Sequence, residues 1–424
     1  MRWMNRSRAA TGLIAAAALF TTPRSEASAQ STEIPPDTVS TVFVSDTIRG
    51  YGAVGGVAAD GLGYVYVADF RNSVWRISPD GTVTGLADGL YGASGNAIGP
   101  RGYLYQSSFN GNYVSRISRT GEVETYATEN LNGPVGIAVN PAGELFVVNC
   151  TAGNVVKIDT EGRSSVFTES ELLACPNGIT FDDRGDLYVV NFNNTLIVKI
   201  TPDGTATEFT NLTGAGGNGH ITFARGGFYV TKFRGNQVFR VNRDGTYRAI
   251  AGTGQAGTAD GEALTATFTR PNGIAATTGG KELWVNDLTV QAPGGSGTPV
   301  VSMRRIRLVT LSDVLAQIDL STNPDDVERL YRAYHESRPG ENTATEAINL
   351  GYQWLQGPVP AAAVTLFTLN AEQYPDNAQP RFHLGELYRY VGQLDQAAEH
   401  YRKALEIQPD LAVASARLAE VTNR

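Results

Sequence analysis

Short segments of alternating apolar and polar residues recur through the first three quarters of the chain. In the first complete unit, an apolar segment is followed by a glycine turn and by the alternating segment Tyr64–Ala68. A third segment, Ser73–Ile77, leads into an Asp-Gly turn and a shorter fourth segment. Such alternation is typical of β-strands with a buried face, and Asp-Gly pairs are typical of hairpin turns. Each unit is therefore predicted to form a four-stranded antiparallel sheet.

The unit occurs six times along the chain. One position in its first strand is glycine in five units and histidine in the other: Gly56, Gly95, Gly136, Gly178, His220 and Gly273. Successive positions lie about 40 residues apart, except for a longer last step. Repeats of about 40 residues with four strands each are typical of β-propeller blades. We therefore predict a mainly β, six-bladed β-propeller over residues 39–310.

Blade six is predicted to lack an outer strand of its own, because the chain becomes helical after Met303–Leu308. An unassigned strand-like segment, Ser40–Ser45, precedes blade one. We expect this segment to pair with blade six, so that the two ends of the domain close the ring together. Closure would remove the open sheet edge that otherwise promotes aggregation.

The strand pattern gives way to helical spacing near Thr310. Small, aromatic and proline residues then recur at fixed spacings within residues 378–411: Leu384, Gly385, Tyr388, Ala397, Tyr401, Ala404 and Pro409. A weaker copy of the same pattern lies about 34 residues earlier. The pattern predicts an all-α domain of paired helices over residues 324–424, after a linker at 311–323. We expect the chain to divide into separable modules near Thr310.

Both modules resemble known families. Ala251–Ala275 combines a glycine-rich loop, an Asp-Gly turn and a Pro-x-Gly-Ile strand start, and this order resembles the linker between blades of NHL-type β-propellers. Residues 378–411 resemble a tetratricopeptide repeat throughout, which implies that the helices bind a protein or peptide partner. On that resemblance, Arg381, Tyr388 and Arg389 would face the partner. The alternative for Tyr388 is a place in the helical core.

The first residues of the chain indicate export. Residues 1–29 combine a basic start, the apolar stretch Gly12–Phe20 and small residues before Gln30. These are the parts of a secretory signal peptide, here followed by a linker at 30–38. We expect an exported protein, periplasmic or extracellular, with no membrane span in the mature chain. The net charge of −8 argues against nucleic acid as a partner, because phosphates need a basic surface.

The two cysteines are predicted to form a disulfide. Cys150 follows the second strand of blade three, and Cys175 precedes the first strand of blade four. Both positions lie on the same face of neighbouring blades, and an exported protein folds in an oxidising compartment. Free reactive thiols are the alternative.

A polar or charged residue ends the second strand of every blade, on that same face: Asp69, Ser108, Asn149, Asn191, Lys232 and Asp287. The loops that enter the first strands add Asn177 and Asn272. All of these are candidate ligand-binding residues around the propeller axis, where a small ligand would bind. Oxygen-rich sites suit Ca²⁺ or Mg²⁺, and Asp69 and Asp287 are candidate metal ligands because blades six and one are neighbours. The alternative is that these side chains cap turns by bonding to nearby backbone groups.

His220 is the only histidine of the predicted propeller, and it replaces the glycine of the repeat. Histidine titrates near neutral pH, so His220 is a candidate catalytic acid or base; a structural role is the alternative. Streptogramin lyases are similar propellers, and the resemblance implies a catalytic histidine with a divalent metal. The senescence-marker and gluconolactonase propellers are also similar, and they bind metal through a glutamate, an aspartate and the asparagine of a Pro-Asn-Gly element. Asn177 and Asn272 stand in such elements, but Val54–Gly56 in blade one offers no glutamate.

The sequence leaves two functions open. The first is an exported scaffold that binds a ligand through the propeller and a protein or peptide through the tetratricopeptide repeats. The second is a metal-dependent lyase or hydrolase that works in the propeller channel, with His220 as its catalytic residue. The architecture agrees with both, because one fold can carry unrelated functions.

Overall fold

The computed structural model describes residues 34–49, 54–214, 216–289, 300–320, 325–357 and 360–423. The predicted signal peptide at residues 1–29 and the expected start of the mature chain at Gln30 lie outside these ranges. Among the helices within them, none is long and apolar enough to cross a membrane.

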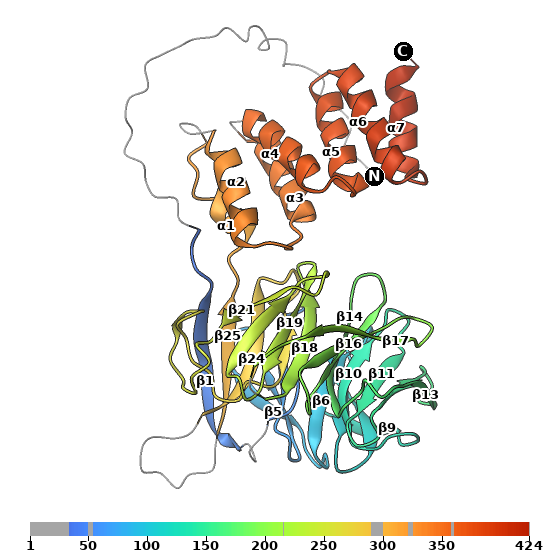
Figure 1. Ribbon diagram of the computed structural model, residues 1–424, viewed down its shortest axis with the longest axis vertical. Helices are drawn as coiled ribbons and strands as arrows, with labels where there is room; N and C mark the ends of the chain where they lie inside the picture. Colours follow the sequence, from blue (N-terminus) through green and yellow to red (C-terminus); the bar gives the residue numbers. More distant parts are fainter. Residues whose placement is uncertain are drawn as a thin grey trace. The chain divides into compact units, whose positions relative to one another are not determined.

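Six antiparallel sheets are arranged in a ring, and they form the six blades predicted from the repeats (Figure 1). Blades one and two consist of β2 (Val57–Ala59), β3 (Val65–Ala68), β4 (Val74–Ile77) and β5 (Val83–Ala87), then β6 (Ala93–Ile98), β7 (Leu104–Ser108), β8 (Tyr113–Ile117) and β9 (Val123–Ala127). Blades three and four consist of β10 (Pro134–Val139), β11 (Leu145–Asn149), β12 (Asn154–Ile158) and β13 (Ser164–Glu169), then β14 (Pro176–Phe181), β15 (Leu187–Asn191), β16 (Leu196–Ile200) and β17 (Ala206–Asn211). Blade five consists of β18 (Asn218–Ala224), β19 (Gly227–Lys232), β20 (Gln237–Val241) and β21 (Tyr247–Ala251). Blade six combines β23 (Ile274–Ala276), β24 (Glu282–Thr289) and β25 (Val300–Arg307) with β1 (Thr38–Arg49) and β22 (Gly261–Glu262).

The repeated glycine of the first strands is required by the close approach of neighbouring blades. A Cβ atom on Gly95 would lie 2.2 Å from the carbonyl oxygen of Val135, and one on Gly136 would lie 2.5 Å from that of Asn177. A side chain at either position would therefore push the neighbouring strand away. The glycine pattern of the sequence reflects how tightly the first strands pack against one another.

Apolar side chains from both faces of each strand fill the space between blades. In β11, Val147 packs towards blade two, whereas Phe146 and Val148 pack towards blade four. Each blade is thus covered on both sides by its neighbours. This accounts for the long apolar runs in the second strands, where strict alternation with polar residues is lost.

The ring is closed by the first strand of the chain, as predicted. β1 pairs antiparallel with β25, from Thr38 opposite Arg307 to Val44 opposite Ser302. β1 also pairs with β22, which lies within the linker between blades five and six. This linker therefore supplies a fifth strand to blade six.

Within the described residues, seven helices follow the propeller: α1 (Leu311–Leu315), α2 (Asp326–Ser337), α3 (Ala344–Leu355), α4 (Pro360–Gln373), α5 (Ala378–Tyr390), α6 (Leu394–Ile407) and α7 (Ala412–Thr422). α3 packs on α4 and α5 packs on α6, as expected for helical repeats. A Cβ atom on Gly351 would lie 2.7 Å from the ring of Phe367, and one on Gly385 would lie 2.7 Å from the ring of Tyr401. The repeated spacing of small and aromatic residues thus lets the paired helices approach closely.

A short helix, α1, lies in the segment that the sequence suggested as a linker. Its start is fixed by a capping box: the Thr310 hydroxyl accepts from the backbone N–H of Asp313, and the Asp313 carboxylate accepts from the backbone N–H of Thr310. Both bonds satisfy backbone donors that a helix end leaves free. The chain therefore passes from β25 into helix almost at once.

A buried ion pair fixes the helices to the propeller. Arg225, in the turn between β18 and β19, donates to the Glu341 carboxylate from Nε at 3.2 Å and from a terminal nitrogen at 2.8 Å. It also donates to the hydroxyl of Tyr334 in α2 at 2.6 Å. The two charged side chains are only 6% and 2% exposed. Burial alone would raise the pKa of Glu341, but the charges of Arg225 and Arg240 and these hydrogen bonds outweigh burial and lower it.

A second buried pair joins the start of the described chain to the same region. Arg338 donates to both carboxylate oxygens of Asp37 at 2.9 Å, and Asp37 also accepts from the backbone N–H of Val309 at 2.7 Å. Asp37 directly precedes β1, so the closing strand, the propeller and the helices share one polar junction. The described residues from Ile34 onward accordingly group into one compact unit.

Candidate functional site

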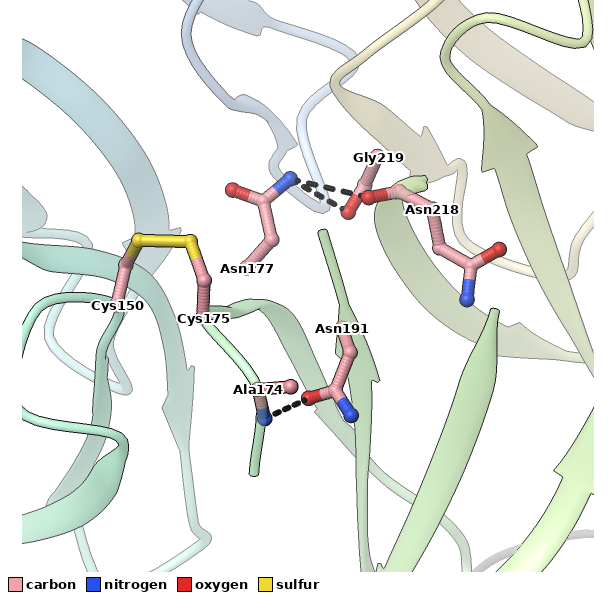
Figure 2. The surroundings of a disulfide bond; sticks show 7 residues. All are labelled: Cys150, Ala174, Cys175, Asn177, Asn191, Asn218 and Gly219. Carbon is pink, nitrogen blue, oxygen red and sulfur yellow. Dashed lines mark hydrogen bonds between the residues drawn. A yellow bond between two sulfur atoms is a disulfide. The ribbon is translucent and has the colours of Figure 1, made fainter. Parts of the chain in front are cut away.

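The asparagines that end the second strands hold the loops that enter the first strands. Asn149 Nδ2 donates to the carbonyl oxygen of Asn130 at 2.9 Å, and Asn149 Oδ1 accepts from the backbone N–H of Asn132 at 3.1 Å. Asn191 repeats this arrangement in blade four with Leu172 at 2.7 Å and Ala174 at 3.2 Å; Figure 2 shows the bond to Ala174. Both side chains are fully buried. Their amides therefore fix the loop in position.

Lys232 occupies the equivalent place in blade five. Its Nζ donates to the carbonyl oxygen of Leu212 at 2.7 Å and lies 3.3 Å from Oδ1 of Asn218. The side chain is 1% exposed, and burial lowers its pKa to about 8. Lys232 thus fastens its loop through a single cationic donor where the neighbouring blade uses an amide.

Asp69 and Ser108 are both buried, but they differ in the hydrogen bonds that their side chains form. Asp69 Oδ1 accepts from the backbone N–H groups of Arg71 and Ser73 at 2.8 and 3.0 Å, which caps the turn after β3. Burial raises the pKa of Asp69, and these hydrogen bonds offset only part of that effect. The Ser108 hydroxyl has no hydrogen-bond partner within the described residues.

Asp287 takes part in a buried ion pair. Its Oδ2 accepts from the backbone N–H of Thr269 at 3.1 Å and lies 3.3 Å from a terminal nitrogen of Arg304. Its Oδ1 accepts from the hydroxyl of Ser302. Neither side chain of the ion pair is exposed. Burial raises the pKa of Asp287, and the Arg304 charge counteracts only part of that rise.

These contacts do not fit a divalent cation. The Asp69 carboxylate already accepts hydrogen bonds from the backbone of a turn. The Asp287 carboxylate is already paired with Arg304. In the described parts of the chain, no group of three or more His, Cys, Asp or Glu side chains is placed so that it could hold a metal ion. Ca²⁺ takes about six to eight oxygen ligands, so two separately occupied carboxylates are an unsuitable donor set.

The two Pro-Asn-Gly asparagines connect neighbouring blades. Asn177 Nδ2 donates to the carbonyl oxygen of Gly219 at 2.8 Å, which ties blade four to blade five (Figure 2). Asn272 Nδ2 donates to the carbonyl oxygen of Val54, which ties blade six to blade one. Both asparagines therefore hold first strands together around the axis.

His220 lies among these connections. Its backbone N–H is shared between the carbonyl oxygen of Asn272 and the hydroxyl of Thr231, both at 2.9 Å. The side chain is 8% exposed, and burial lowers its pKa to about 4. Within the described residues, Nε2 has no hydrogen-bond partner. His220 is therefore a neutral imidazole at neutral pH with one unused polar atom.

The predicted disulfide is present and joins Cys150 to Cys175 across blades three and four (Figure 2). Cys175 has a left-handed backbone with φ of 51°, although it precedes a proline. Glycine stands at the equivalent position in two other blades, as Gly92 and Gly133, also with positive φ. A cysteine pays a steric penalty in this conformation that glycine does not. The cross-link therefore occupies a left-handed position at which two other blades use glycine and blade six uses Arg270.

Breaking the disulfide should cost stability, and the loss should depend on the residue placed at 175. Cys150→Ser with Cys175→Ser removes closure of the 25-residue separation and should lower the free energy of unfolding by about 3 kcal/mol. Cys150→Ser with Cys175→Gly should lose about 1 kcal/mol less, because glycine relieves the left-handed backbone. Equilibrium unfolding in guanidinium measures both variants. Equal stability of the two would contradict the backbone argument.

An unexpected polar cluster lies between blades one and two. Asn96 and Gln106 face each other on β6 and β7 and are 8% and 0% exposed. They occupy the places that Ile137 and Val147 fill in blade three. In the described structure, neither polar atom of the Asn96 side chain nor Oε1 of Gln106 has a partner. An alignment of the six repeats reveals this polar pair, because only blade two has polar residues at both positions.

Asn96→Leu should raise the free energy of unfolding by about 1 kcal/mol, because it replaces unpartnered buried polar atoms by apolar atoms of similar shape. Asn149→Leu is the matched control, since its amide makes several buried hydrogen bonds; it should lower stability by about 2 kcal/mol. Thermal and guanidinium unfolding report both changes. A loss of stability in Asn96→Leu as large as that of the control would contradict the absence of partners.

Two of the hollows that lie outside the predicted site involve the helices. The junction hollow, of about 600 Å³, lies between the blade five and blade six turns and α3, and its walls include these residues: Arg225, Thr278, Lys281, Thr345, Asn349 and Gln353. The helical groove, of about 310 Å³, lies on α3 and α5 and is lined by the following: Tyr352, Leu355, Gln356, Glu386, Leu387, Arg389 and Tyr390. No sequence pattern indicated the junction hollow, because its walls come from segments far apart in the chain.

The propeller and the helices each match a protein family. The virginiamycin B lyase family matches residues 71–289, which is more than half of the chain, and a tetratricopeptide repeat matches residues 378–411. No curated protein matches the sequence.

Several solved structures are similar to the propeller. A catalytically inactive virginiamycin B lyase from Staphylococcus aureus with quinupristin is 19% identical over 60% of this chain and 80% of its own, with a TM-score of 0.45. An auxiliary nutrient binding protein from Bacteroides thetaiotaomicron is 15% identical over 63% of this chain and 76% of its own, with a TM-score of 0.52. A gluconolactonase from Xanthomonas campestris is 17% identical over 64% of this chain and 95% of its own, with a TM-score of 0.47.

The family match begins in the first blade and ends with β24 of blade six, so it covers most of the ring described above. Helices α5 and α6 carry the separate repeat match. The chain therefore belongs to the virginiamycin B lyase family, and it carries a tetratricopeptide repeat beyond the propeller.

Proposed function

We propose that the protein is an exported binding scaffold whose helices hold a protein or peptide partner beside a rigid propeller. The observation that carries this proposal is the helical groove. Tyr390 is 75% exposed and lines the groove together with Leu355 and Leu387. Exposed aromatic side chains beside apolar hollows are typical of binding surfaces. The tetratricopeptide match, which includes α5, supports the same assignment.

The lining of the helical groove shows which of the candidate residues are placed to contact a partner. Arg389 lines it, with its guanidinium held 3.0 Å from the Glu386 carboxylate. Tyr388 instead stacks on His400 with ring centroids 5.3 Å apart and packs in the helical core, which agrees with the alternative interpretation of that residue. Arg381 is not among the described residues of the groove. The proposal therefore assigns partner contact to Arg389 and Tyr390.

Affinity capture from a periplasmic or extracellular extract tests the scaffold function. Full-length protein should retain a defined partner, identified by mass spectrometry, and Tyr390→Ala should lose it. Tyr91→Ala is the matched control, because Tyr91 is a tyrosine on the propeller that is 62% exposed. Loss of the partner in both variants, or in neither, would count against the groove.

Export is part of the proposal, and it rests on the basic and apolar pattern of residues 1–29. The secreted or periplasmic protein should begin near Gln30. Intact-mass measurement with and without reductant should show the shortened chain and the mass difference of one disulfide. Recovery of the full chain from the cytoplasm alone, with residues 1–29 intact, would contradict export.

A second candidate function is a lyase or hydrolase that acts in the propeller. Family membership favours it, and so does the buried Nε2 of His220, which is available to accept a proton. A pKa of about 4 keeps this nitrogen unprotonated at neutral pH, but the same low pKa makes it a weak base. Since the donor set does not fit a divalent cation, no step is assigned to a metal.

Incubation with quinupristin, the ligand named with the staphylococcal structure, separates the two functions. A scaffold should leave the compound unchanged, as judged by mass and chromatography. Turnover by the wild type that is lost in His220→Asn, with the thermal midpoint preserved, would establish the enzyme instead.

A further inference from the structure

We propose that the propeller forms one end of the peptide-binding site. An extended peptide would lie along α3 and α5 in the helical groove and continue into the junction hollow, where the turns of blades five and six provide the opposite wall. This inference rests on the proposed function, namely that the helices bind a peptide. It adds that the helices alone do not make a complete site.

Both hollows are lined by residues of α3. Asn349 and Gln353 line the junction hollow, whereas Tyr352 and Gln356 line the helical groove. Residues three and four positions apart are neighbours on a helix surface, so these two pairs form adjacent stripes of one helix. A ligand that fills both hollows must therefore be elongated.

The junction hollow is lined by groups that suit a polypeptide main chain. The side chains of Asn349 and Gln353 are exposed and form no hydrogen bond within the described residues. Each amide provides a donor and an acceptor, which is the combination that a peptide group requires. Buried peptide groups need such partners, because an unpaired N–H or C=O is costly away from water.

The charges around the junction hollow do not favour an anion. Arg225 lines the hollow, but its charge is neutralised by Glu341 at 2.8 Å. The second cation of the lining, Lys281, is offset in charge by the carboxylate of Glu346, which lies 3.9 Å from Arg225. The hydroxyl groups of Thr278 and Thr345 add neutral hydrogen-bonding capacity. A neutral ligand rich in donors and acceptors is therefore expected in this hollow.

The lining of the helical groove suits an apolar group on the ligand. Leu355, Leu387 and Tyr390 line it, and its charged residues Glu386 and Arg389 are already paired with each other. A ligand with polar groups at one end and an apolar group at the other matches an extended peptide that carries an apolar side chain. An oligosaccharide would place hydroxyl groups against the apolar lining and would lose hydrogen bonds there.

The propeller wall is held in place without a ligand. A Cβ atom on Gly280 in the blade six turn would lie 2.8 Å from Cγ of Arg225, so the blade five and blade six turns are in direct contact. Arg225 in turn is fixed to Glu341 and Tyr334. A wall that is already ordered reduces the conformational entropy lost on binding.

Selection of peptides from a displayed library of random sequences, with the full-length protein as bait, provides the probe. Fluorescence anisotropy then measures the selected peptide against variants of both walls. Thr278→Arg fills the junction hollow from the propeller side and should weaken binding about tenfold or more, which corresponds to about 1.4 kcal/mol. Gln353→Ala should weaken binding from the helix side. Thr82→Arg, at an exposed threonine in a turn of blade one, is the matched control and should bind normally.

Thermal unfolding of each variant shows that the fold is retained before affinities are compared. Normal binding by Thr278→Arg, combined with loss of binding in Tyr390→Ala, would overturn the composite site and leave the helical groove as the whole site. Failure to select any peptide, or binding unaffected by both substitutions, would overturn the proposed function and this inference together.

Discussion

Glu341→Ala should destabilise the whole described chain by about 3 to 5 kcal/mol, the cost typical of removing one partner from a buried ion pair. The substitution leaves the Arg225 guanidinium, 6% exposed, without its carboxylate. It also removes the nearer of the two acceptors of the Tyr334 hydroxyl, at 2.8 Å, and leaves the carbonyl oxygen of Val309 at 3.2 Å. Because the network joins blade five to α2, propeller and helix signals should be lost at a lower denaturant concentration than in the wild type.

Glu328→Ala is the matched control for this prediction. Glu328 pairs with Arg332 at 2.8 Å, but both side chains are more than half exposed. Exposed ion pairs of this kind contribute about 0.3 to 0.5 kcal/mol, so the control should unfold almost like the wild type. Circular dichroism and tryptophan fluorescence follow the unfolding. Similar stability of both variants would show that the junction does not hold the modules together.

The same junction changes what is expected of a chain that ends near Thr310. The sequence suggested that such a chain would keep a folded propeller. In the structure, Arg240 of the propeller donates to the carbonyl oxygen of Gly340 at 2.8 Å, and Asp37 is paired with Arg338. Truncation would expose these groups together with Arg225. We therefore expect the isolated propeller to be less stable than the full-length protein.

Asp287→Ala should lower the free energy of unfolding by about 3 kcal/mol, whether or not calcium is present. The substitution removes a carboxylate that is paired with Arg304, and both side chains are fully buried. Arg304 keeps a second partner, Asp260, at 2.8 Å, so the loss should fall short of complete unfolding. Thermal unfolding in calcium and in a chelator measures the effect. A wild-type stabilisation by calcium that saturates and disappears in Asp287→Ala would instead support the candidate metal site.

Asp69→Ala provides the comparison on the neighbouring blade. Asp69 accepts two backbone hydrogen bonds in a turn and has no buried cationic partner in the described structure. Its removal should cost about 1 kcal/mol, also independently of calcium. A metal site shared by the two aspartates would make both substitutions abolish one calcium response. If Asp69 caps a turn and Asp287 pairs with an arginine, the two substitutions should lower the free energy of unfolding by different amounts, and neither should change a response to calcium.

The sequence predicted the fold well because the features that define it are local and repeated. Gly95 and Gly136 recur because first strands approach too closely for a side chain, and that requirement is the same in each blade. The pairing of β1 with blade six followed from a missing outer strand. Even the disulfide could be inferred from the places of Cys150 and Cys175 in the repeat.

The candidate site was harder to predict because its chemistry depends on residues distant in the chain. Whether Asp287 faces a metal or an arginine is decided by Arg304, which lies on a different strand and follows no motif. The side-chain amides of Asn149 and Asn191 donate to backbone carbonyl oxygens of loops that lie about twenty residues earlier in the chain. The junction hollow brings Thr278 close to Asn349, and no local pattern relates those segments.

Closure of the ring by β1 imposes an order on folding. Thr38 is among the first residues of the described chain, but its partner Arg307 is made about 270 residues later. Until then, an apolar strand must remain unpaired while five blades form beside it. Contacts across such sequence separations form slowly, and unpaired strands of this kind associate readily with other chains. A chain exported from its N-terminus would therefore depend on chaperones during transit, and the last blade to be made would determine when the protein becomes resistant to proteases.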